Sequence, residues 1–164
     1  MAIKRPLISP PLELKEQFLA FALDDQSRGL VAIHQVVEVL SVPSFEIISL
    51  PQMSECIVGV YNWRGEILWM VDLSEFLGYP QTPTARQMVA IVVHVEGLHM
   101  GWIVSKVEDT VWHPRNAIQP APPMAFAPEI EPYLRGYLLQ PNGDTSLILD
   151  AAAILRAPLW QTPC

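Results

Sequence analysis

The sequence predicts an all-β protein made of two small β-barrels of similar topology. Three observations support this prediction: short apolar segments bounded by turn residues, a pattern that occurs twice along the chain, and only two short stretches with helix signals. Hydrophobic residues make up 51% and charged residues 16% of the 164 residues, a composition that favours a folded core over disorder.

The predicted strands are short segments rich in Val, Ile and aromatic residues, because such side chains pack well on a pleated, half-buried sheet. They span residues 18–23, 30–40, 57–61, 67–71, 89–95, 100–104, 107–112, 137–140 and 146–149. Polar turns that contain Gly, and in two cases Asn, stand at residues 24–29, 62–65, 96–97 and 141–144. Both residue types adopt positive φ at little steric cost, so each turn is expected to close an antiparallel hairpin.

Two short helices are expected, at residues 72–77 and 150–155. Each begins with an Asp whose carboxylate can accept hydrogen bonds from the free N–H groups of the first turn. Asp72 and Glu75 have the spacing of a capping box, and Gly78 provides the stop.

The internal repeat is the most informative feature of the chain. Residues 35–40 resemble residues 106–111, and each set follows a predicted hairpin. Residues 59–72 likewise resemble residues 136–150: a Gly, an apolar strand, a polar turn, a second apolar strand, and an Asp that opens a helix. Repetition of this kind implies two barrels of similar topology.

The repeat also suggests where the chain divides. We expect a first barrel at residues 17–79 and a second at 88–155, each able to exchange a terminal strand with the other. Units of this size have marginal cores when alone, so the two are expected to pack together. Residues 1–16 are expected to form an N-terminal arm and residues 156–164 a C-terminal tail.

Charge and sorting signals restrict the partners. A net charge of −7 repels phosphate backbones and anionic membrane surfaces, so no nucleic acid partner is expected. The first residues lack the apolar core of a signal peptide, and the most apolar stretch, residues 88–104, is interrupted by polar residues and a glycine. We therefore expect a cytoplasmic protein without direct membrane insertion.

Motifs for catalysis or cofactor binding are absent from the sequence, including phosphate loops, dinucleotide fingerprints and nucleophile elbows. Cys56 and Cys164 lie far apart, and no histidine pair has the helical spacing of a metal site. His94 and His99 can meet across a hairpin, but no third ligand stands near them in sequence. No catalytic residue, cofactor or metal is expected.

Five tryptophans could form a stacking platform, but two of them have a simpler explanation. Trp69 and Trp102 fall within apolar strands and are expected in the core. Trp63 instead lies beside Arg64 in a predicted turn, and Trp and Arg are the side chains most enriched at binding hot spots. A protein contact is therefore favoured there over a solvated turn.

The turn at residues 62–65, preceded by Val58-Gly59-Val60 and followed by Val71-Asp72-Leu73, resembles the signature of CheW-like domains. Further matches in order are residues 17–21, 36–39, 50–51, 118–122 and 133–136. The resemblance covers residues 17–155 and implies one stand-alone CheW-like domain. It implies two five-stranded SH3-like barrels packed around a shared apolar interface, with short helices. The sequence departs from the family pattern where Trp63 stands in place of the usual Leu.

The resemblance implies a non-catalytic adaptor that couples the cytoplasmic tip of a chemoreceptor to the regulatory domain of a CheA-type histidine kinase. It assigns Val36, Glu38 and Arg64 to partner binding, with Asn62 shaping the turn that presents Arg64. The simpler interpretations are a core strand residue for Val36 and a solvated face for Glu38. The stimulus (chemical, light or surface), the output (flagella or pili) and a further regulatory partner stay open.

Two other functions stay open at this point. One is a sugar- or nucleotide-binding module that uses a surface lined by tryptophan. The other is a small hydrolase, although Asp24 and Asp25, which could form a carboxylate pair, lie in a turn where carboxylates usually accept hydrogen bonds from their own backbone.

Overall fold

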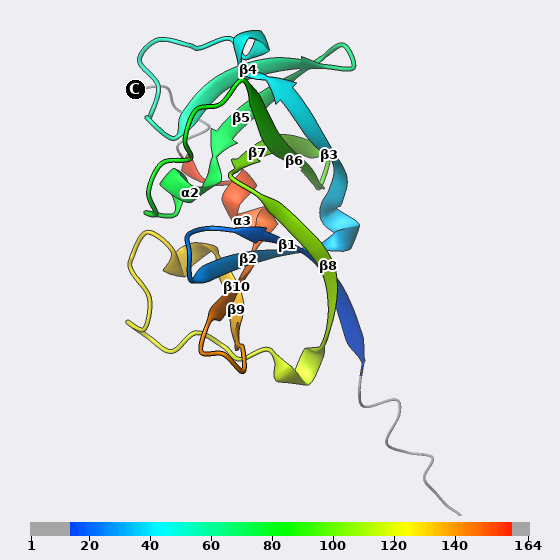
Figure 1. The fold of residues 1–164 in the computed structure, drawn as a ribbon, viewed down its shortest axis with the longest axis vertical. Helices are drawn as coiled ribbons and strands as arrows, with labels where there is room; N and C mark the ends of the chain where they lie inside the picture. Colours follow the sequence, from blue (N-terminus) through cyan, green and yellow to red (C-terminus); the bar gives the residue numbers. More distant parts are fainter. Residues whose placement is uncertain (1–13, 159–164) are drawn as a thin grey trace, which may run out of the picture.

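The computed structural model describes residues 14–158 and contains two five-stranded sheets. We call the lower sheet in Figure 1 half-barrel A and the upper sheet half-barrel B, because both are curled. Half-barrel A has the order β8-β1-β2-β10-β9 and comprises β1 (Lys15–Ala22), β2 (Ser27–Ala32), β8 (Val107–Pro114), β9 (Leu134–Leu139) and β10 (Thr145–Leu149). Half-barrel B has the order β3-β6-β7-β5-β4 and comprises β3 (Val36–Pro43), β4 (Ile57–Trp63), β5 (Glu66–Asp72), β6 (Gln87–Val95) and β7 (Leu98–Val104). The predicted all-β class with two five-stranded units is confirmed.

The two halves of the sequence exchange a hairpin, which differs from the expected division into residues 17–79 and 88–155. The β1–β2 hairpin joins the later strands in half-barrel A, and the β6–β7 hairpin joins the earlier strands in half-barrel B. A two-stranded hairpin is thus exchanged rather than one terminal strand. The cause is the 3-10 turn Ile33–Gln35, which ends β2 and carries the chain from one sheet to the other. The segment at residues 30–40, predicted to be one strand, is therefore two strands in different sheets.

The internal repeat is visible in the strand pairing. β1 pairs with β8 in half-barrel A as β6 pairs with β3 in half-barrel B, both antiparallel. β10 lies parallel to β2 as β5 lies parallel to β7. An isolated bridge also precedes each later hairpin, from Ile48 to Val60 and from Gln119 to Tyr137. The two half-barrels therefore have the same internal arrangement.

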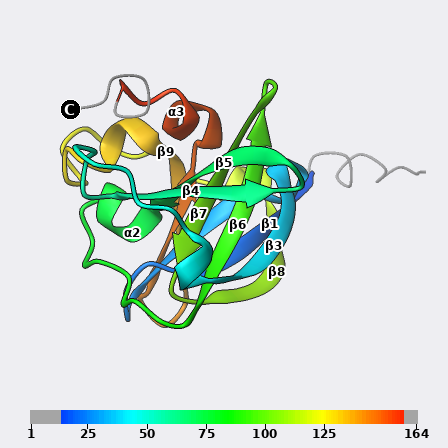
Figure 2. The same ribbon diagram turned by 90° about the horizontal axis from the view of Figure 1, so that it is seen from above.

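The turns and helix starts follow local chemistry. In the β1–β2 turn, Asp24 Oδ1 accepts hydrogen bonds from the backbone N–H groups of Gln26 and Ser27, at 2.8 and 2.6 Å. α2 (Leu73–Phe76) begins after Asp72, and α3 (Ala151–Leu155) begins after Asp150, whose carboxylate accepts a hydrogen bond from the Ala153 N–H at 3.1 Å. From above, both helices lie on the side opposite β3 and β8 (Figure 2).

Three apolar clusters hold the fold together. The largest lies between the half-barrels and includes Phe21 and Leu147 from A and Val71 and Trp102 from B, all buried. A second cluster fills the inside of half-barrel B, and a smaller third cluster around Phe18 fills the inside of half-barrel A. The shared apolar interface is confirmed, and burial of apolar area on this scale is the main stabilising contribution in such a fold.

A bidentate ion pair closes half-barrel A. The Arg135 guanidinium, at the start of β9, donates to the Glu16 carboxylate on β1 at 2.8 and 2.5 Å. The Glu16 side chain is only 10% exposed, and the Arg115 Nε lies 3.7 Å from the Glu16 Oε1. The hydrogen bonds from Arg135 lower the pKa of Glu16, although burial opposes them.

The ends of the chain are only partly described. Most of the expected N-terminal arm, residues 1–13, and most of the expected tail, residues 159–164, lie outside the described residues. Lys15 and Glu16, which the arm was expected to include, belong to β1. Between residues 14 and 158, no helix has the length and apolar character needed to cross a membrane.

Candidate functional site

The β4–β5 turn presents Arg64 at its tip. Trp63 pairs with Glu66, so the turn has two central residues, and both Arg64 (φ 55°) and Gly65 (φ 83°) have positive φ. This is the geometry of a type I′ hairpin turn, which suits the right-handed twist of the strands. The Asn62 Oδ1 accepts a hydrogen bond from the Gly65 N–H at 2.9 Å. Asn62 therefore holds the turn that presents Arg64.

An ion pair links Arg64 to Glu38 on β3. The two residues lie on opposite edge strands of half-barrel B, because β3 and β4 stand at the two ends of the strand order. The sheet curls until these edges approach, and the pair spans its open end. The Arg64 side chain is 65% exposed and that of Glu38 is 26% exposed, so the cation remains available to a partner.

Trp63 is buried, in contrast to the contact predicted for it at an exposed turn. The residue is 7% exposed and packs with the cluster inside half-barrel B. It is the last residue of β4, and strand alternation directs its side chain inward, as it does for Tyr61. The Trp63 ring lies 5.1 Å from the His99 ring, and the Arg64 Cζ lies 4.9 Å from the Trp63 ring centre. The Trp63 ring thus packs beneath the Arg64 guanidinium and supports it.

The two histidines singled out in the sequence do meet. His94 and His99 face each other in the β6–β7 register, with ring centres 4.5 Å apart. Within residues 14–158, no cluster of three or more His, Cys, Asp or Glu side chains is placed to hold a metal ion. The histidines instead extend the aromatic stack that begins at Trp63.

The edge strand β3 carries exposed apolar side chains that flank Glu38 in sequence, with Val39 on the opposite face of the sheet from Glu38. Val36 is half-buried against the central cluster, whereas Val37 and Val39 are 42% and 45% exposed. Sequence reasoning missed Val37 and Val39, although the alternation of an edge strand provides the signal. We call Val37, Glu38, Val39 and Arg64 the β3 surface.

A second exposed apolar pair lies on half-barrel B. Ile67 on β5 is 72% exposed and Leu98 on β7 is 52% exposed. The two strands pair in parallel from Met70 opposite Gly101 onward, and Ile67 and Leu98 each stand three residues before that first pair, on neighbouring strands. We call these two residues the β5–β7 patch. Sequence reasoning did not single them out, because both belong to strands that are otherwise buried.

The fold and these surfaces define a two-unit β scaffold that presents a cation and apolar side chains together, which is the chemistry of a protein-contact surface. The chain belongs to the family described as CheW-like domain, whose model matches residues 17–159.

Similar proteins agree with this assignment. The chain is 34% identical over 91 residues to a probable chemotaxis protein CheW of Rhizobium etli (55% of this chain, 57% of that protein). It is 31% identical over 103 residues to the protein PilI of Pseudomonas aeruginosa (62% and 56%), and 27% identical over 73 residues to the chemotaxis protein CheW of Bacillus subtilis (44% and 47%). The matches thus span about half the length of these relatives.

A solved structure shows the same fold. The scaffolding protein TtCheW from Thermoanaerobacter tengcongensis superposes with a TM-score of 0.71 at 23% identity, over 83% of this chain and 89% of that chain. At this level of identity the likeness concerns the fold alone. No comparison supports a sugar- or nucleotide-binding module.

Proposed function

We propose that this chain is a non-catalytic adaptor that holds the cytoplasmic tip of a chemoreceptor and the regulatory domain of a CheA-type histidine kinase in one assembly. The observation that carries the proposal is the family match over residues 17–159, which covers both half-barrels. The relatives named as chemotaxis proteins support it.

The β3 surface is the proposed contact with one of these partners. Arg64 provides an exposed cation, Glu38 fixes its position, and Val37 and Val39 provide apolar contact area along the same edge strand, with Val39 on its other face. Val36 supports this edge from the core side, and Asn62 sets the turn. Trp63 contributes by supporting Arg64 rather than by touching the partner.

The mechanism is geometric. A rigid body with two separate surfaces keeps receptor and kinase at high effective concentration, so weak individual contacts suffice. A movement of the receptor then shifts the kinase between its states, because both are bound to the same adaptor. The effect is a coupling free energy between two binding sites. The β5–β7 patch is the proposed second surface, because Ile67 and Leu98 expose apolar side chains on two strands other than the β3 edge.

The finer assignments are part of the same proposal. We infer a cytoplasmic location from the partners, both of which present their coupling parts on that side. The match to a PilI protein makes a pilus-linked pathway one of the two outputs, beside a flagellar one. Co-purification from the native cell would reveal the kinase and receptor concerned, and a further regulatory protein if one binds.

A charge-swap experiment tests the role of Arg64. Arg64→Glu is expected to weaken binding of the kinase regulatory domain or the receptor tip by about tenfold or more, as loss of a hot-spot cation does. The double variant Glu38→Arg with Arg64→Glu restores an ion pair with reversed polarity. If Arg64 touches the partner, the double variant still binds weakly.

The matched control is Arg86→Glu. Arg86 is exposed and directly precedes β6, whereas His94 lies at the far end of that strand. The substitution Arg86→Glu changes the charge by the same amount as Arg64→Glu. Its binding is expected to equal that of the unmodified chain. Full restoration of binding by the double variant would show instead that the ion pair has only a structural role, and would overturn the assignment of Arg64.

A further inference from the structure

Half-barrel A contains a cavity lined by residues of β1, β2, β8 and β10. Its volume is about 260 Å³, and its floor is apolar, with Leu30 at the base. Ser146, Gln140 and His113 form a polar wall, and Arg28 lies at the rim. Ser146 is only 1% exposed, so a polar atom is built into the wall rather than into open surface.

The internal repeat explains why this space exists. Ile148 pairs with Leu30 as Met70 pairs with Gly101, so Ser146 takes the place that Leu68 has in half-barrel B. Leu68 is fully buried and fills the interior of half-barrel B. A serine is much smaller and polar, so the same position in half-barrel A leaves a gap lined by a hydroxyl.

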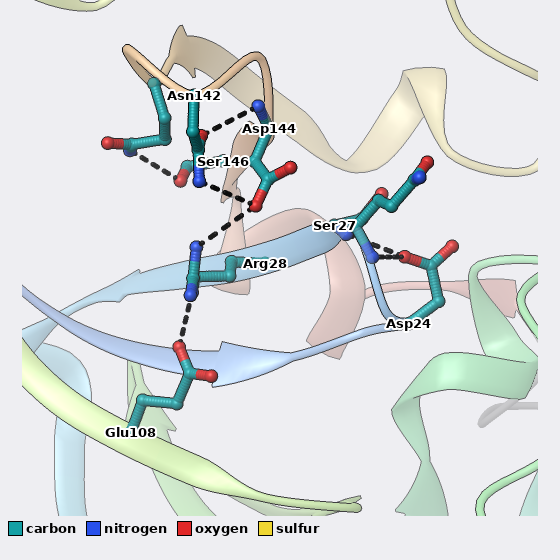
Figure 3. Close-up of polar contacts among 9 residues, drawn as sticks. Asp24, Ser27, Arg28, Glu108, Asn142, Asp144 and Ser146 are labelled. Carbon is teal, nitrogen blue, oxygen red and sulfur yellow. Dashed lines mark hydrogen bonds and ion pairs between the residues drawn. The ribbon is translucent and has the colours of Figure 1, made fainter.

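The one arginine at the rim is already neutralised. The Arg28 Nε donates to Glu108 Oε1 at 2.5 Å, and its Nη1 lies 3.8 Å from Asp144 Oδ2 (Figure 3). Asp109, the next residue of β8, also lines the cavity, and it has no ion pair within the described residues. The rim therefore carries a carboxylate without a cation.

Gln140 adds a hydrogen-bond acceptor to the lining of the cavity. The Gln140 Nε2 donates to Ser146 Oγ at 2.9 Å, and among residues 14–158 no donor is found for the amide oxygen of Gln140. Burial lowers the pKa of His113, so its ring is neutral near pH 7 and adds no positive charge. A ligand that brings donors and a positive charge would satisfy these groups.

We propose that this cavity binds a guanidinium or primary ammonium group on a short aliphatic stem. The charged head lies between Asp109 and the Gln140 amide oxygen, and the stem packs on Leu30. Such a group is provided either by a free small amine or by an arginine or lysine side chain of a protein.

The test uses a charged probe and its neutral counterpart. Titration of the isotope-labelled chain with n-butylguanidinium is expected to shift the backbone NMR resonances of Leu30 and Ser146. The nearly isosteric n-butylurea lacks the charge and is expected to bind at least about tenfold more weakly, the usual cost of losing a charge-assisted contact. Equal binding of the two probes, or no shift at these residues, would overturn the proposal.

Substitutions of the lining residues test whether n-butylguanidinium binds in this cavity. Asp109→Asn is expected to weaken n-butylguanidinium binding by about tenfold, and Ser146→Leu to abolish it by filling the gap as Leu68 does. Glu46→Gln, which removes an exposed carboxylate from the other half-barrel, is expected to leave binding unchanged. Asp109→Asn binding as tightly as the unmodified chain would contradict the proposal.

A capped Gly-Arg-Gly peptide, tested beside its citrulline analogue, then separates the two sources of the ligand. Charge-dependent binding of the peptide indicates a protein side chain, and binding of n-butylguanidinium alone indicates a free amine.

Discussion

Arg64 stacks over the ring of Trp63, with its Cζ 4.9 Å from the ring centre, and pairs with Glu38 from the opposite edge of the same sheet. The Arg64 guanidinium is thus held by the buried Trp63 ring below it and by the Glu38 carboxylate beside it. Both holders are local to half-barrel B, so the exposed part of the guanidinium is placed before any partner arrives. Preorganisation of this kind reduces the entropy lost on binding.

Trp63 is expected to matter for folding more than for binding area. Trp63→Ala should lower the free energy of unfolding by about 3 to 5 kcal/mol, because it leaves a cavity in the interior of half-barrel B. Urea denaturation followed by circular dichroism measures this. Trp112→Ala removes a tryptophan that is 60% exposed and should change stability by no more than about 0.5 kcal/mol. A loss of less than about 1 kcal/mol for Trp63→Ala would contradict the buried role.

The strands and turns could be predicted from the sequence because their causes are local. Alternating apolar residues and Gly-containing turns marked the hairpins, and Asp72 and Asp150 marked the helix starts. The hairpin exchange could not be predicted in this way, since it depends on the turn Ile33–Gln35 and on which distant edge strand each hairpin meets.

The same limit applies to the candidate site. Arg64 and Asn62 were predicted to act together at a turn, which is a local relationship. The ion pair from Arg64 to Glu38 and the burial of Trp63 both follow from the curl of the sheet. A linear pattern does not encode that curl directly.

Gly59 is expected to be required for the backbone bridge between Ile48 and Val60, which covers the edge of β4. The Ile48–Val60 bridge covers that edge with hydrogen bonds of 2.8 and 2.9 Å, and a Cβ at Gly59 would overlap the Ile48 carbonyl oxygen. Gly59→Ala should therefore destabilise the chain by about 2 kcal/mol or more. Gly97→Ala, at a positive φ of 82° but with open space around it, should cost clearly less. Thermal unfolding of both variants checks the difference, and equal losses would show that contact with Ile48 is unimportant.

Glu16 is expected to make stability depend on acid pH. Its pKa is lower in the folded chain than in the unfolded chain, so its stabilising contribution is complete above the unfolded value, about 4.3, and is lost as the pH falls through the folded value. Glu16→Gln should cost about 1 to 3 kcal/mol at pH 7 and flatten the stability profile below pH of about 4.3. Glu96→Gln, in an exposed ion pair with Arg156, provides the control with little expected effect. An unchanged acid profile for Glu16→Gln would contradict this role.

Substitutions on the two proposed surfaces are expected to weaken binding of different partners. Val39→Glu on the β3 surface should weaken one partner, and Leu98→Glu on the β5–β7 patch should weaken the other, by about tenfold each. Both side chains are half exposed, so the midpoint of thermal unfolding should change little. Pull-down assays against each partner measure the pattern. Loss of the same partner in both variants would mean that the two places belong to one surface.

The most direct test of the adaptor proposal is co-sedimentation of the kinase with receptor-containing membranes, measured with and without this chain. The proposal predicts that the kinase sediments with the membranes in amounts that rise with added chain and fall when Arg64→Glu replaces it. Equal kinase in the pellet without the chain, or a chain that stays in the supernatant, would contradict it.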